Sequence, residues 1–372
     1  MGAFKNRFRT RHLRLRRNVR AAASRAFAAL VRGRDAGSSL PDPATIRTVL
    51  VVRLNGRMGN TLFLTPMLAA IHDILPGASI DVLTMYPDAG DLLRGLPGVR
   101  KVITLPHKAW WNLRNVAGAL RSLRSTDYDL VIDPAFNSAG DRVAMLLCRA
   151  RRRLGFGGDE QWLRLDFAAS LPPDVRHEAL RPLALLQQAF GCTIPPGRAR
   201  LRVANGTDEL AAGARLLAER LRAAAREPGP GSPVIGFFAA ARGKKDLGPQ
   251  WWREFWTAYL ALRPETVAME VLPTATQPAI DERFATVHCP SPRMLAATLS
   301  GVDWFFSADT GPMHLASAAG VPTVALFDST NPAAFGPLKP EDVALRIAGL
   351  GPREVAAACA DRVAGRARWQ RL

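Results

Sequence analysis

The sequence predicts an α/β protein with two domains, each built around a parallel β-sheet that helices cover on both faces. Apolar runs of strand length alternate with segments of helical period along most of the chain. The 372 residues also exceed what one hydrophobic core usually organises. A Pro- and Gly-rich stretch, REPGPGSP at 226–233, separates two such alternating series. We therefore expect an N-terminal domain over 46–205 and a C-terminal domain over 206–372.

In the first series, β-branched apolar runs predict strands, and segments with a 3.6-residue apolar period predict helices. Alternation of this kind is typical of a parallel sheet that is buried on both faces. A long helical pattern at 207–226 ends this half or links it to the next. The expected elements are a strand at 48–54, a helix at 62–75, a strand at 79–85, a short helix at 91–98, a strand at 99–106, a helix at 111–124, a strand at 128–135 and a helix at 141–148.

The second series repeats this alternation. Two similar halves place a cleft between the C-terminal ends of their strands, where open α/β sheets bind ligands. The expected elements are a strand at 233–240, a helix at 250–261, a strand at 266–273, a helix at 294–300, a strand at 302–308, a helix at 313–319 and a strand at 322–328.

The composition is that of an ordinary globular protein, with 48% hydrophobic and 22% charged residues. The four cysteines are far apart and form no CxxC pair or His/Cys cluster, so we expect no disulfides, no metal site and a reducing compartment. No apolar run approaches the length of a membrane-spanning helix, and the N-terminus lacks a signal-peptide pattern. These features predict a cytoplasmic protein.

The net charge of +18 is concentrated near the N-terminus, because residues 1–34 hold eleven Lys and Arg and no acid. In the predicted arm over 1–40, apolar residues such as Val19, Ala23 and Phe27 recur at helical spacing between arginines. A basic amphipathic helix favours an anionic membrane surface, so we expect peripheral binding at the inner face of the cytoplasmic membrane. A solvated extension is the alternative. Nucleic acid is the least favoured partner, because no recognition motif accompanies the arm.

The segment SADTGPMHLASAAG carries the most specific chemical pattern. A predicted strand ends at Asp309 and Thr310, and Gly311 permits a close backbone approach. Pro312 suits the first turn of the helix that follows, because its missing N–H is no loss there. The free amides and the positive dipole end of such a helix form an anion-binding site. Two other interpretations stay open, namely Asp309 or Thr310 as a simple helix cap and His314 as a packed core residue.

This segment, extended to SADTGPMHLASAAGVPTVALF, resembles the signature of glycosyltransferase family 9, the ADP-heptose:lipopolysaccharide heptosyltransferases and their relatives. VLVVRLNGRMGNTLFLTPMLAAI, YDLVIDPAFNS, RHEALRPLALLQQAFG and IGFFAAARGKKDLGPQWWREFW resemble further family segments, so the likeness spans about 47–337. The resemblance implies a GT-B fold of two facing Rossmann-like domains. It also implies inverting transfer, without a metal ion or other cofactor, from a nucleotide-sugar on the C-terminal domain, ADP-heptose being one option. The acceptor, on the N-terminal domain, would be lipopolysaccharide, lipid-linked or polysaccharide.

For the donor, the resemblance implies that the strand-end loop contacts the diphosphate and that Lys244 or Lys245 binds a phosphate oxygen as a point charge. The chain reads KKDLGP where the family reads KxWP, so both lysines are candidates. A solvated basic loop is the alternative for this stretch. The donor-binding candidates are Lys244, Lys245, Asp309, Thr310, Gly311, Pro312 and His314.

On the acceptor side, the family pattern GDxxxxTP maps onto Gly59, Asn60, Thr65 and Pro66. We expect Gly56 and Gly59 to turn the chain out of a buried strand and to let the backbone approach a ligand. The resemblance places the catalytic base at position 60, but the amide of Asn60 cannot accept a proton from an acceptor hydroxyl.

Three hypotheses follow from Asn60. Another carboxylate serves as the base, Asp133 being the best placed in sequence, although a strand-end or capping role also explains Asp133. Alternatively, stabilisation of the leaving group sustains the reaction, because loss of one acid–base group typically costs about 10²–10⁴-fold in rate. Lastly, the chain is a catalytically impaired nucleotide-sugar-binding or scaffold protein. We expect an active enzyme, since the phosphate-side residues are intact.

Overall fold

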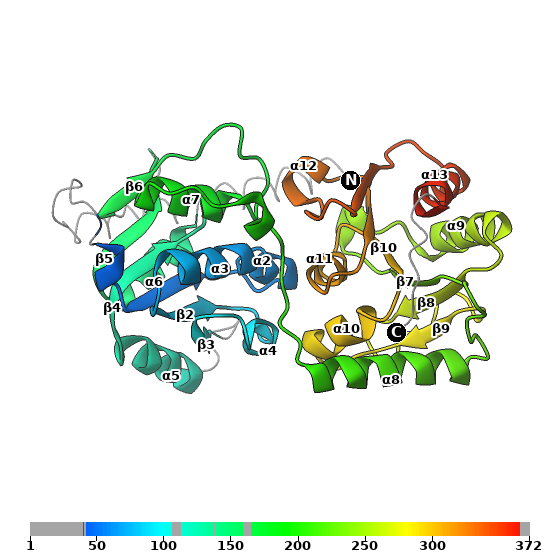
Figure 1. Cartoon of the computed structure of the whole chain (residues 1–372), viewed down its shortest axis with the longest axis horizontal. Helices are drawn as coiled ribbons and strands as arrows, with labels where there is room; N and C mark the ends of the chain where they lie inside the picture. Colours follow the sequence, from blue (N-terminus) through cyan, green and yellow to red (C-terminus); the bar gives the residue numbers. More distant parts are fainter. Residues whose placement is uncertain (1–39, 41, 106–112, 137, 159–164, 365–372) are drawn as a thin grey trace, which may run out of the picture.

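A computed structural model describes residues 40, 42–105, 113–136, 138–158 and 165–364 of the chain. The predicted basic arm over 1–40 lies outside this part, apart from Leu40. The described residues form two six-stranded sheets with helices packed on them, so the predicted α/β fold is confirmed (Figure 1). The expected division at residue 206 falls in the connection between the two sheets.

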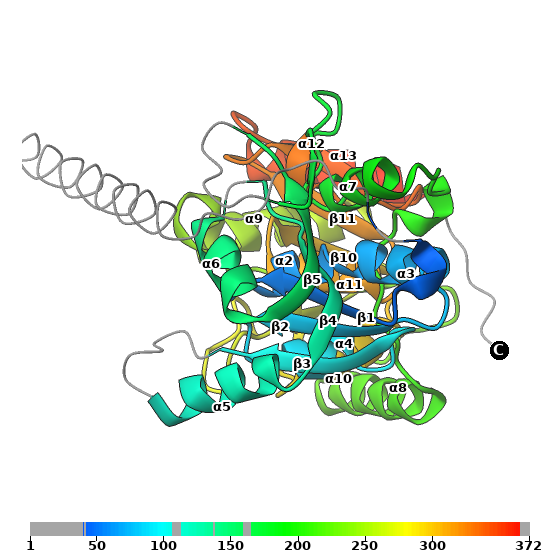
Figure 2. The ribbon, with the colours of Figure 1, turned by 90° about the vertical axis from the view of Figure 1, so that its left-hand side faces the viewer.

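The N-terminal sheet has the strand order β3-β2-β1-β4-β5-β6, and all of its neighbouring strands run parallel. Alternate strand residues fill two cores, because α3 and α7 pack on one face and α5 and α6 on the other (Figure 2). The strands are β1 (Thr48–Arg53), β2 (Ser79–Thr84), β3 (Val99–Thr104), β4 (Asp127–Asp133), β5 (Arg149–Phe156) and β6 (Phe167–Ala169). The helices are η1 (Pro43–Thr45), α2 (Met58–Leu62), α3 (Thr65–Ile74), α4 (Ala89–Leu93), α5 (Leu113–Arg124), α6 (Ala139–Leu147), α7 (Arg181–Phe190) and η3 (Pro196–Arg198).

The C-terminal sheet has the order β12-β11-β10-β7-β8-β9 and is also parallel throughout. Helices α8, α10 and α11 cover one face, and α9 and α13 cover the other with an aromatic-rich core. The strands are β7 (Val234–Phe238), β8 (Val267–Val271), β9 (Ala285–Val287), β10 (Trp304–Ala308), β11 (Thr323–Phe327) and β12 (Val343–Arg346). The helices are α8 (Thr207–Ala223), η4 (Gly243–Lys245), α9 (Pro249–Leu262), α10 (Pro292–Leu299), α11 (Gly311–Ala318), α12 (Pro332–Phe335) and α13 (Pro352–Ala364).

Both sheets have the same doubly wound order, counted from the first strand of each. In such a sheet the chain changes direction beside its first strand, and the crevice at the C-terminal ends of the two strands there binds ligands. The crevices lie between β1 and β4 in one domain and between β7 and β10 in the other. The predicted site segments follow these four strands, so the topology brings them to the two crevices.

The structure corrects some element boundaries. The predicted helix at 62–75 is two helices, and the first begins at Met58, so Gly59 and Asn60 are helical rather than part of a loop. Strands β5, β6, β9 and β12 and helices α12 and α13 were not predicted. None of the described helices combines the length and apolar character that crossing a membrane requires.

Candidate functional site

Asp309 and Lys245 lie at the centre of the candidate donor site. Asp309 directly follows β10, and Lys245 ends the η4 turn after β7. Lys245 Nζ lies 2.5 Å from Asp309 Oδ2 and 3.2 Å from the Asp309 carbonyl oxygen. Only 5% of the Asp309 side chain is exposed, against 34% of the Lys245 side chain. The carboxylate therefore holds the ammonium group in place while the lysine stays accessible to an anion.

Asp309 is ionised in this setting. Burial alone would raise the pKa of its carboxyl, but the contacts with His314 and Lys245 outweigh burial and hold the pKa at about 2. A hydrogen bond with the Thr330 side chain, in the loop after β11, also lowers this pKa. The loops that follow β7, β10 and β11 therefore meet at one carboxylate, and these strands are neighbours in the sheet.

The two candidate lysines occupy different environments. The ammonium group of Lys245 pairs with Asp309. Lys244 instead contributes its backbone carbonyl, which accepts a hydrogen bond from Ser329 Oγ at 3.2 Å. Within the described part of the chain, the Lys244 ammonium forms no ion pair. The geometry thus favours Lys245 as the phosphate-binding lysine.

Helix α11 points uncapped amides at this turn. Thr310 occupies its N-cap position, but the Thr310 side chain makes no capping hydrogen bond. Its hydroxyl lies 2.8 Å from Ser307 Oγ instead. Gly311 and Pro312 form the first turn, where Pro312 has no N–H to satisfy. Thr310 therefore does not cap α11 through its side chain. The backbone amides at the start of α11 stay free, and such amides suit phosphate oxygens.

His314 connects this turn to the other domain. Its ring is 5% exposed, and Nε2 lies 3.7 Å from Asp309 Oδ1. The ring packs edge-on against Phe63, with 4.6 Å between ring centroids. A Cβ on Gly59 would come within 2.9 Å of His314 Cδ2, so glycine permits this contact. Gly59 therefore brings the backbone of α2 close to α11, whereas we had expected a glycine that approaches a ligand.

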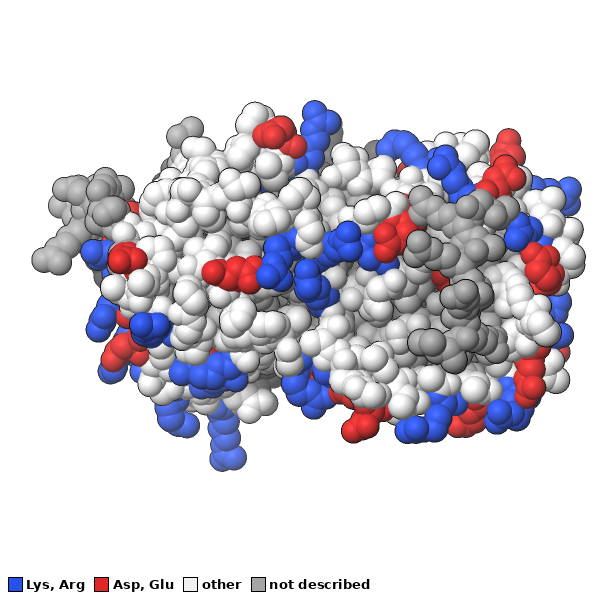
Figure 3. All heavy atoms as spheres, in the orientation of Figure 1, with Lys and Arg blue, Asp and Glu red and all other residues white. Residues whose placement is uncertain are grey.

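The contacts of Gly311 complete this interface. A Cβ on Gly311 would lie 3.3 Å from the Cβ of Met58, the first residue of α2. The turn at 309–311 thus faces the N-terminal domain, and Thr310 and Gly311 are half-buried rather than buried. On the face drawn in Figure 3, Lys and Arg side chains gather along the junction of the two domains. The position of the turn and the basic character of the junction both suit an anionic ligand between the domains.

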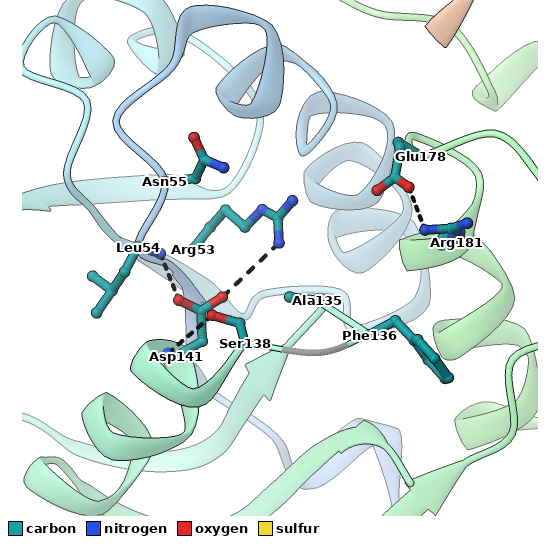
Figure 4. Close-up of a pocket in the computed structure, with 9 residues that line it drawn as sticks. All are labelled: Arg53, Leu54, Asn55, Ala135, Phe136, Ser138, Asp141, Glu178 and Arg181. Carbon is teal, nitrogen blue, oxygen red and sulfur yellow. Dashed lines mark hydrogen bonds and ion pairs between the residues drawn. The ribbon is translucent and has the colours of Figure 1, made fainter. Parts of the chain in front are cut away.

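The N-terminal domain holds a cavity of about 360 Å³ at the C-terminal ends of β1 and β4 (Figure 4). Asp141 Oδ1 accepts a hydrogen bond from the Leu54 N–H at 2.8 Å, which fixes the loop after β1. Glu178 and Arg181 lie on the opposite side of the pocket and pair with each other. The lining residues are Arg53, Leu54, Asn55, Ala135, Phe136, Ser138, Asp141, Glu178 and Arg181.

Sequence analysis did not identify this pocket. Glu178 and Arg181 belong to RHEALR, the start of a segment for which the sequence predicts a family resemblance but no site residue. Two charged residues three positions apart at the start of a helix are common on protein surfaces, so this pattern does not predict a binding site. Only the fold shows that these two residues lie beside β1 and β4.

The other acceptor-side candidates, Asn60, Gly56 and Thr65, differ in burial and in hydrogen bonding. Asn60 is half-buried in α2, and its side chain makes no hydrogen bond to any described residue. Gly56 is exposed in the loop after β1. Thr65 is fully buried, and its hydroxyl donates to the Leu62 carbonyl at 2.7 Å and accepts from the Arg202 N–H at 3.0 Å. Thr65 therefore fixes the start of α3 and the segment that leads to the second domain.

Asp133, the candidate replacement base, is also fully buried. Its Oδ2 lies 2.9 Å from Arg142 Nε, and its Oδ1 accepts from the Ala135 N–H at 2.8 Å. Burial raises the pKa of Asp133 above its usual range, and Arg142 opposes that shift. The structure therefore favours the strand-end role for Asp133, because an acceptor hydroxyl cannot reach its carboxylate.

The described residues contain no group of three or more His, Cys, Asp or Glu side chains that could hold a metal ion. At the turn, a bound anion would meet Lys245 Nζ and the amides of α11.

Comparisons with known proteins agree with this arrangement. Residues 291–359, which include β10, the turn and α11, match the model of glycosyltransferase family 9 (heptosyltransferase). A search of curated proteins found no significant match. A family 9 glycosyl transferase from Veillonella parvula has a similar structure, with a TM-score of 0.70, 16% identity and coverage of 88% of this chain and 100% of that one.

Two structures from E. coli are similar as well. The heptosyltransferase WaaC, solved with ADP, has a TM-score of 0.65 and 19% identity, and the match covers 86% of this chain and 99% of that one. ADP-heptose lps heptosyltransferase II has a TM-score of 0.63 and 16% identity, with the same coverage of 86% and 99%. At these identities the comparisons show that the two-domain fold is shared.

Proposed function

We propose that this chain is a heptosyltransferase-like member of glycosyltransferase family 9 and that it transfers a sugar from a nucleotide-sugar bound at the 309–311 turn. The Lys245–Asp309 pair beside the uncapped start of α11 supports this proposal. A diphosphate needs cations or N–H donors at its oxygens, and this turn offers both.

The proposed reaction is a displacement at the anomeric carbon that inverts its configuration without a metal ion. An acceptor hydroxyl attacks the anomeric carbon while the bond to the diphosphate breaks, so negative charge grows on the leaving group. Lys245 Nζ and the amides at Gly311 and beyond would neutralise this charge. The acceptor would enter from the N-terminal domain, where the cavity after β1 and β4 lies.

The donor that we propose is ADP-heptose, and the acceptor is a lipopolysaccharide, lipid-linked or polysaccharide molecule. The similar solved structures include the E. coli heptosyltransferase WaaC with ADP and the same enzyme with ADP-2-deoxy-2-fluoro heptose. The basic arm over 1–40 would hold the enzyme at the anionic inner face of the membrane, near such an acceptor. Deletion of this arm should move the protein to the soluble fraction at low salt while donor binding persists.

The second candidate function is a nucleotide-sugar-binding protein without turnover, and Asn60 is the observation that favours it. A panel of nucleotides and nucleotide-sugars in thermal shift tests the donor first, because specific binding raises the unfolding temperature by mass action. Release of ADP from ADP-heptose then separates the two candidates. An active enzyme releases ADP, whereas a binder shows the thermal shift alone and gains turnover only in Asn60→Asp.

A further inference from the structure

The proposed transfer needs a group that takes the proton of the acceptor hydroxyl, and Asn60 cannot do so. A general base must reach that hydroxyl within hydrogen-bond distance. Among the residues that line the N-terminal cavity, two are carboxylates, Asp141 and Glu178. The question is which of them has a free oxygen on the accessible side of the cavity.

Both carboxylate oxygens of Asp141 already face groups of the N-terminal domain. Its side chain is 1% exposed, Oδ1 accepts from the Leu54 N–H, and Oδ2 faces Arg53 Nη1 at 3.9 Å. Ser138, the N-cap of α6, accepts a hydrogen bond from the Asp141 N–H at 3.2 Å. These contacts hold the loop after β1 and the start of α6 together. Asp141 therefore shapes the cavity and offers no oxygen to a substrate.

Glu178 has the opposite character. Its side chain is 24% exposed, and Oε1 accepts a hydrogen bond from Arg181 Nη1. Oε2 has no hydrogen-bond partner in the part of the chain that the structure describes. In Figure 4 the carboxylate points toward the cavity from the side opposite to Asp141. One oxygen is thus held by an arginine, and the other is open to a ligand.

Glu178 also lies at the border with the donor domain. Its N–H donates to the Ala334 carbonyl of the C-terminal domain at 3.0 Å. The preceding His177 packs on Phe63, and Phe63 packs on His314, with ring centroids 5.6 and 4.6 Å apart. His314 in turn neighbours Asp309. A chain of direct contacts therefore connects Glu178 to the proposed diphosphate site.

We propose that Glu178 is the catalytic base, in place of the carboxylate that position 60 lacks; this inference rests on the proposed function. The acceptor oxygen bonds to the anomeric carbon as the carbon–oxygen bond to the diphosphate breaks. Glu178 Oε2 takes the acceptor's proton, and the diphosphate leaves with the bonding electrons. Arg181 orients the carboxylate through Oε1 and leaves Oε2 free.

The test uses the full chain with ADP-heptose as the donor and water as the acceptor, and it measures ADP release. Glu178→Gln should lower turnover about 10²–10⁴-fold, the usual effect of removing a general base. The dissociation constant for ADP should stay unchanged, which separates this role from a structural one. Glu219→Gln, an exposed residue on α8, is the matched control and should behave as the wild type.

Two further readouts identify a base specifically. Wild-type kcat/KM should fall at low pH as one carboxylate is protonated, and Glu178→Gln should remove this limb of the profile. In the Glu178→Gln background, Asn60→Asp should restore turnover at least about tenfold, since it supplies a carboxylate at the other candidate position. Recovery by that second change also shows that the double variant is folded.

Four results would overturn the inference. Wild-type turnover in Glu178→Gln would exclude Glu178 as the base, and so would a loss that only matches weaker ADP binding. A wild-type chain that binds ADP-heptose without turnover would exclude catalysis but preserve the donor site. Absence of any nucleotide binding would overturn the proposed function as well.

Discussion

Lys245 and Asp309 are 64 residues apart in the chain, and their pairing depends on the adjacent strands β7 and β10. The carboxylate fixes the ammonium group before a ligand arrives, so less side-chain entropy is lost on binding. The same carboxylate would repel a diphosphate if the lysine were absent. Lys245 therefore has two effects on anion binding, through its own charge and through neutralisation of Asp309.

We predict that Lys245→Ala weakens ADP binding about 10- to 100-fold, the range expected for loss of a charge-assisted hydrogen bond. Lys244→Ala is the matched control, and its effect should stay below about threefold, as for an exposed charge. Isothermal titration calorimetry measures both. Asp309→Asn in the Lys245→Ala background should recover part of the affinity. Equal losses in the two single variants would contradict the assignment of Lys245.

The sequence could identify the turn after β10, because its residue types follow a strand end, and the resemblance to family 9 indicated the two lysines. It could not choose between Lys244 and Lys245, since adjacent residues in a short turn point in different directions that only the fold determines. It also could not show that Asp133 pairs with Arg142. Arg142 lies on α6, and its guanidinium group packs against Gly155 of β5. A Cβ on Gly155 would lie only 2.8 Å from Arg142 Nη1, so glycine is needed to make room for the guanidinium group.

Helix α8 shows how a single glycine sets the distance between two elements. Gly213 lies against α10, and a Cβ there would come within 2.3 Å of the carbonyl carbon of Ala297. That atom belongs to the backbone of a buried helix and cannot move aside as a side chain can. Close packing of α8 on α10 therefore requires glycine at this position.

We predict that Gly213→Ala destabilises the protein by about 1–3 kcal/mol, because overpacking exceeds the gain in helix propensity. Gly118→Ala in α5 is the matched control, since a Cβ there meets nothing within 4 Å. It should stabilise the protein by about 0.5–1 kcal/mol, as expected for alanine in a helix interior. Denaturant unfolding measures both free energies. A neutral Gly213→Ala variant would mean that α8 can lift from α10 at little cost.

Some helices and strands could not be predicted, because contacts in the folded protein override the preference of the local sequence. The basic stretch RARRRLGF resembles a solvated loop, yet it forms β5. Its arginines are tolerated because the first half of the strand is partly exposed, and Arg151 Nη1 lies 3.2 Å from Asp129 Oδ1 on β4. The break between α2 and α3 was also missed, since apolar periodicity continues through Phe63 and Leu64 while Pro66 starts a new helix.

The two domains meet through a small set of buried contacts that includes His177. Its Nε2–H donates to the Gly336 carbonyl at 2.8 Å, and its Nδ1 accepts from the Ala179 N–H at 3.1 Å. This pattern requires a neutral ring, because a proton on Nδ1 would face the Ala179 N–H. Burial accordingly lowers the pKa of His177 to about 4.

The depressed pKa of His177 makes stability depend on pH. An unfolded histidine binds its proton below about pH 6.5, whereas the folded one stays neutral down to about pH 4, so the unfolded state holds more protons in this window. The contribution of His177 is thus complete above pH 6.5 and declines toward pH 4, by about 3 kcal/mol in total. Denaturant unfolding should show this loss in the wild type and a smaller one in His177→Gln. His72→Gln, on the exposed surface of α3, is the control and should behave as the wild type. Equal pH profiles of unfolding free energy for the wild type and His177→Gln would show that His177 does not cause the pH dependence.

The closed arrangement of the domains depends on Gly59, because α2 can approach α11 only while no side chain separates them. In Gly59→Ala the new Cβ would lie 2.9 Å from His314 Cδ2, and the buried His314 ring is held between Phe63 and Asp309. We predict that α2 and α11 separate, so that the radius of gyration measured by small-angle X-ray scattering rises. ADP affinity should change little, because the proposed nucleotide contacts belong to the C-terminal domain, whereas turnover should fall as the proposed donor and acceptor sites move apart. Gly90→Ala in α4, where a Cβ would meet nothing within 4 Å, should leave both quantities unchanged. If Gly59→Ala instead lowers ADP affinity as much as turnover, then α2 supports the donor site directly. The effect of Gly59 would then not be explained by the distance between the two domains.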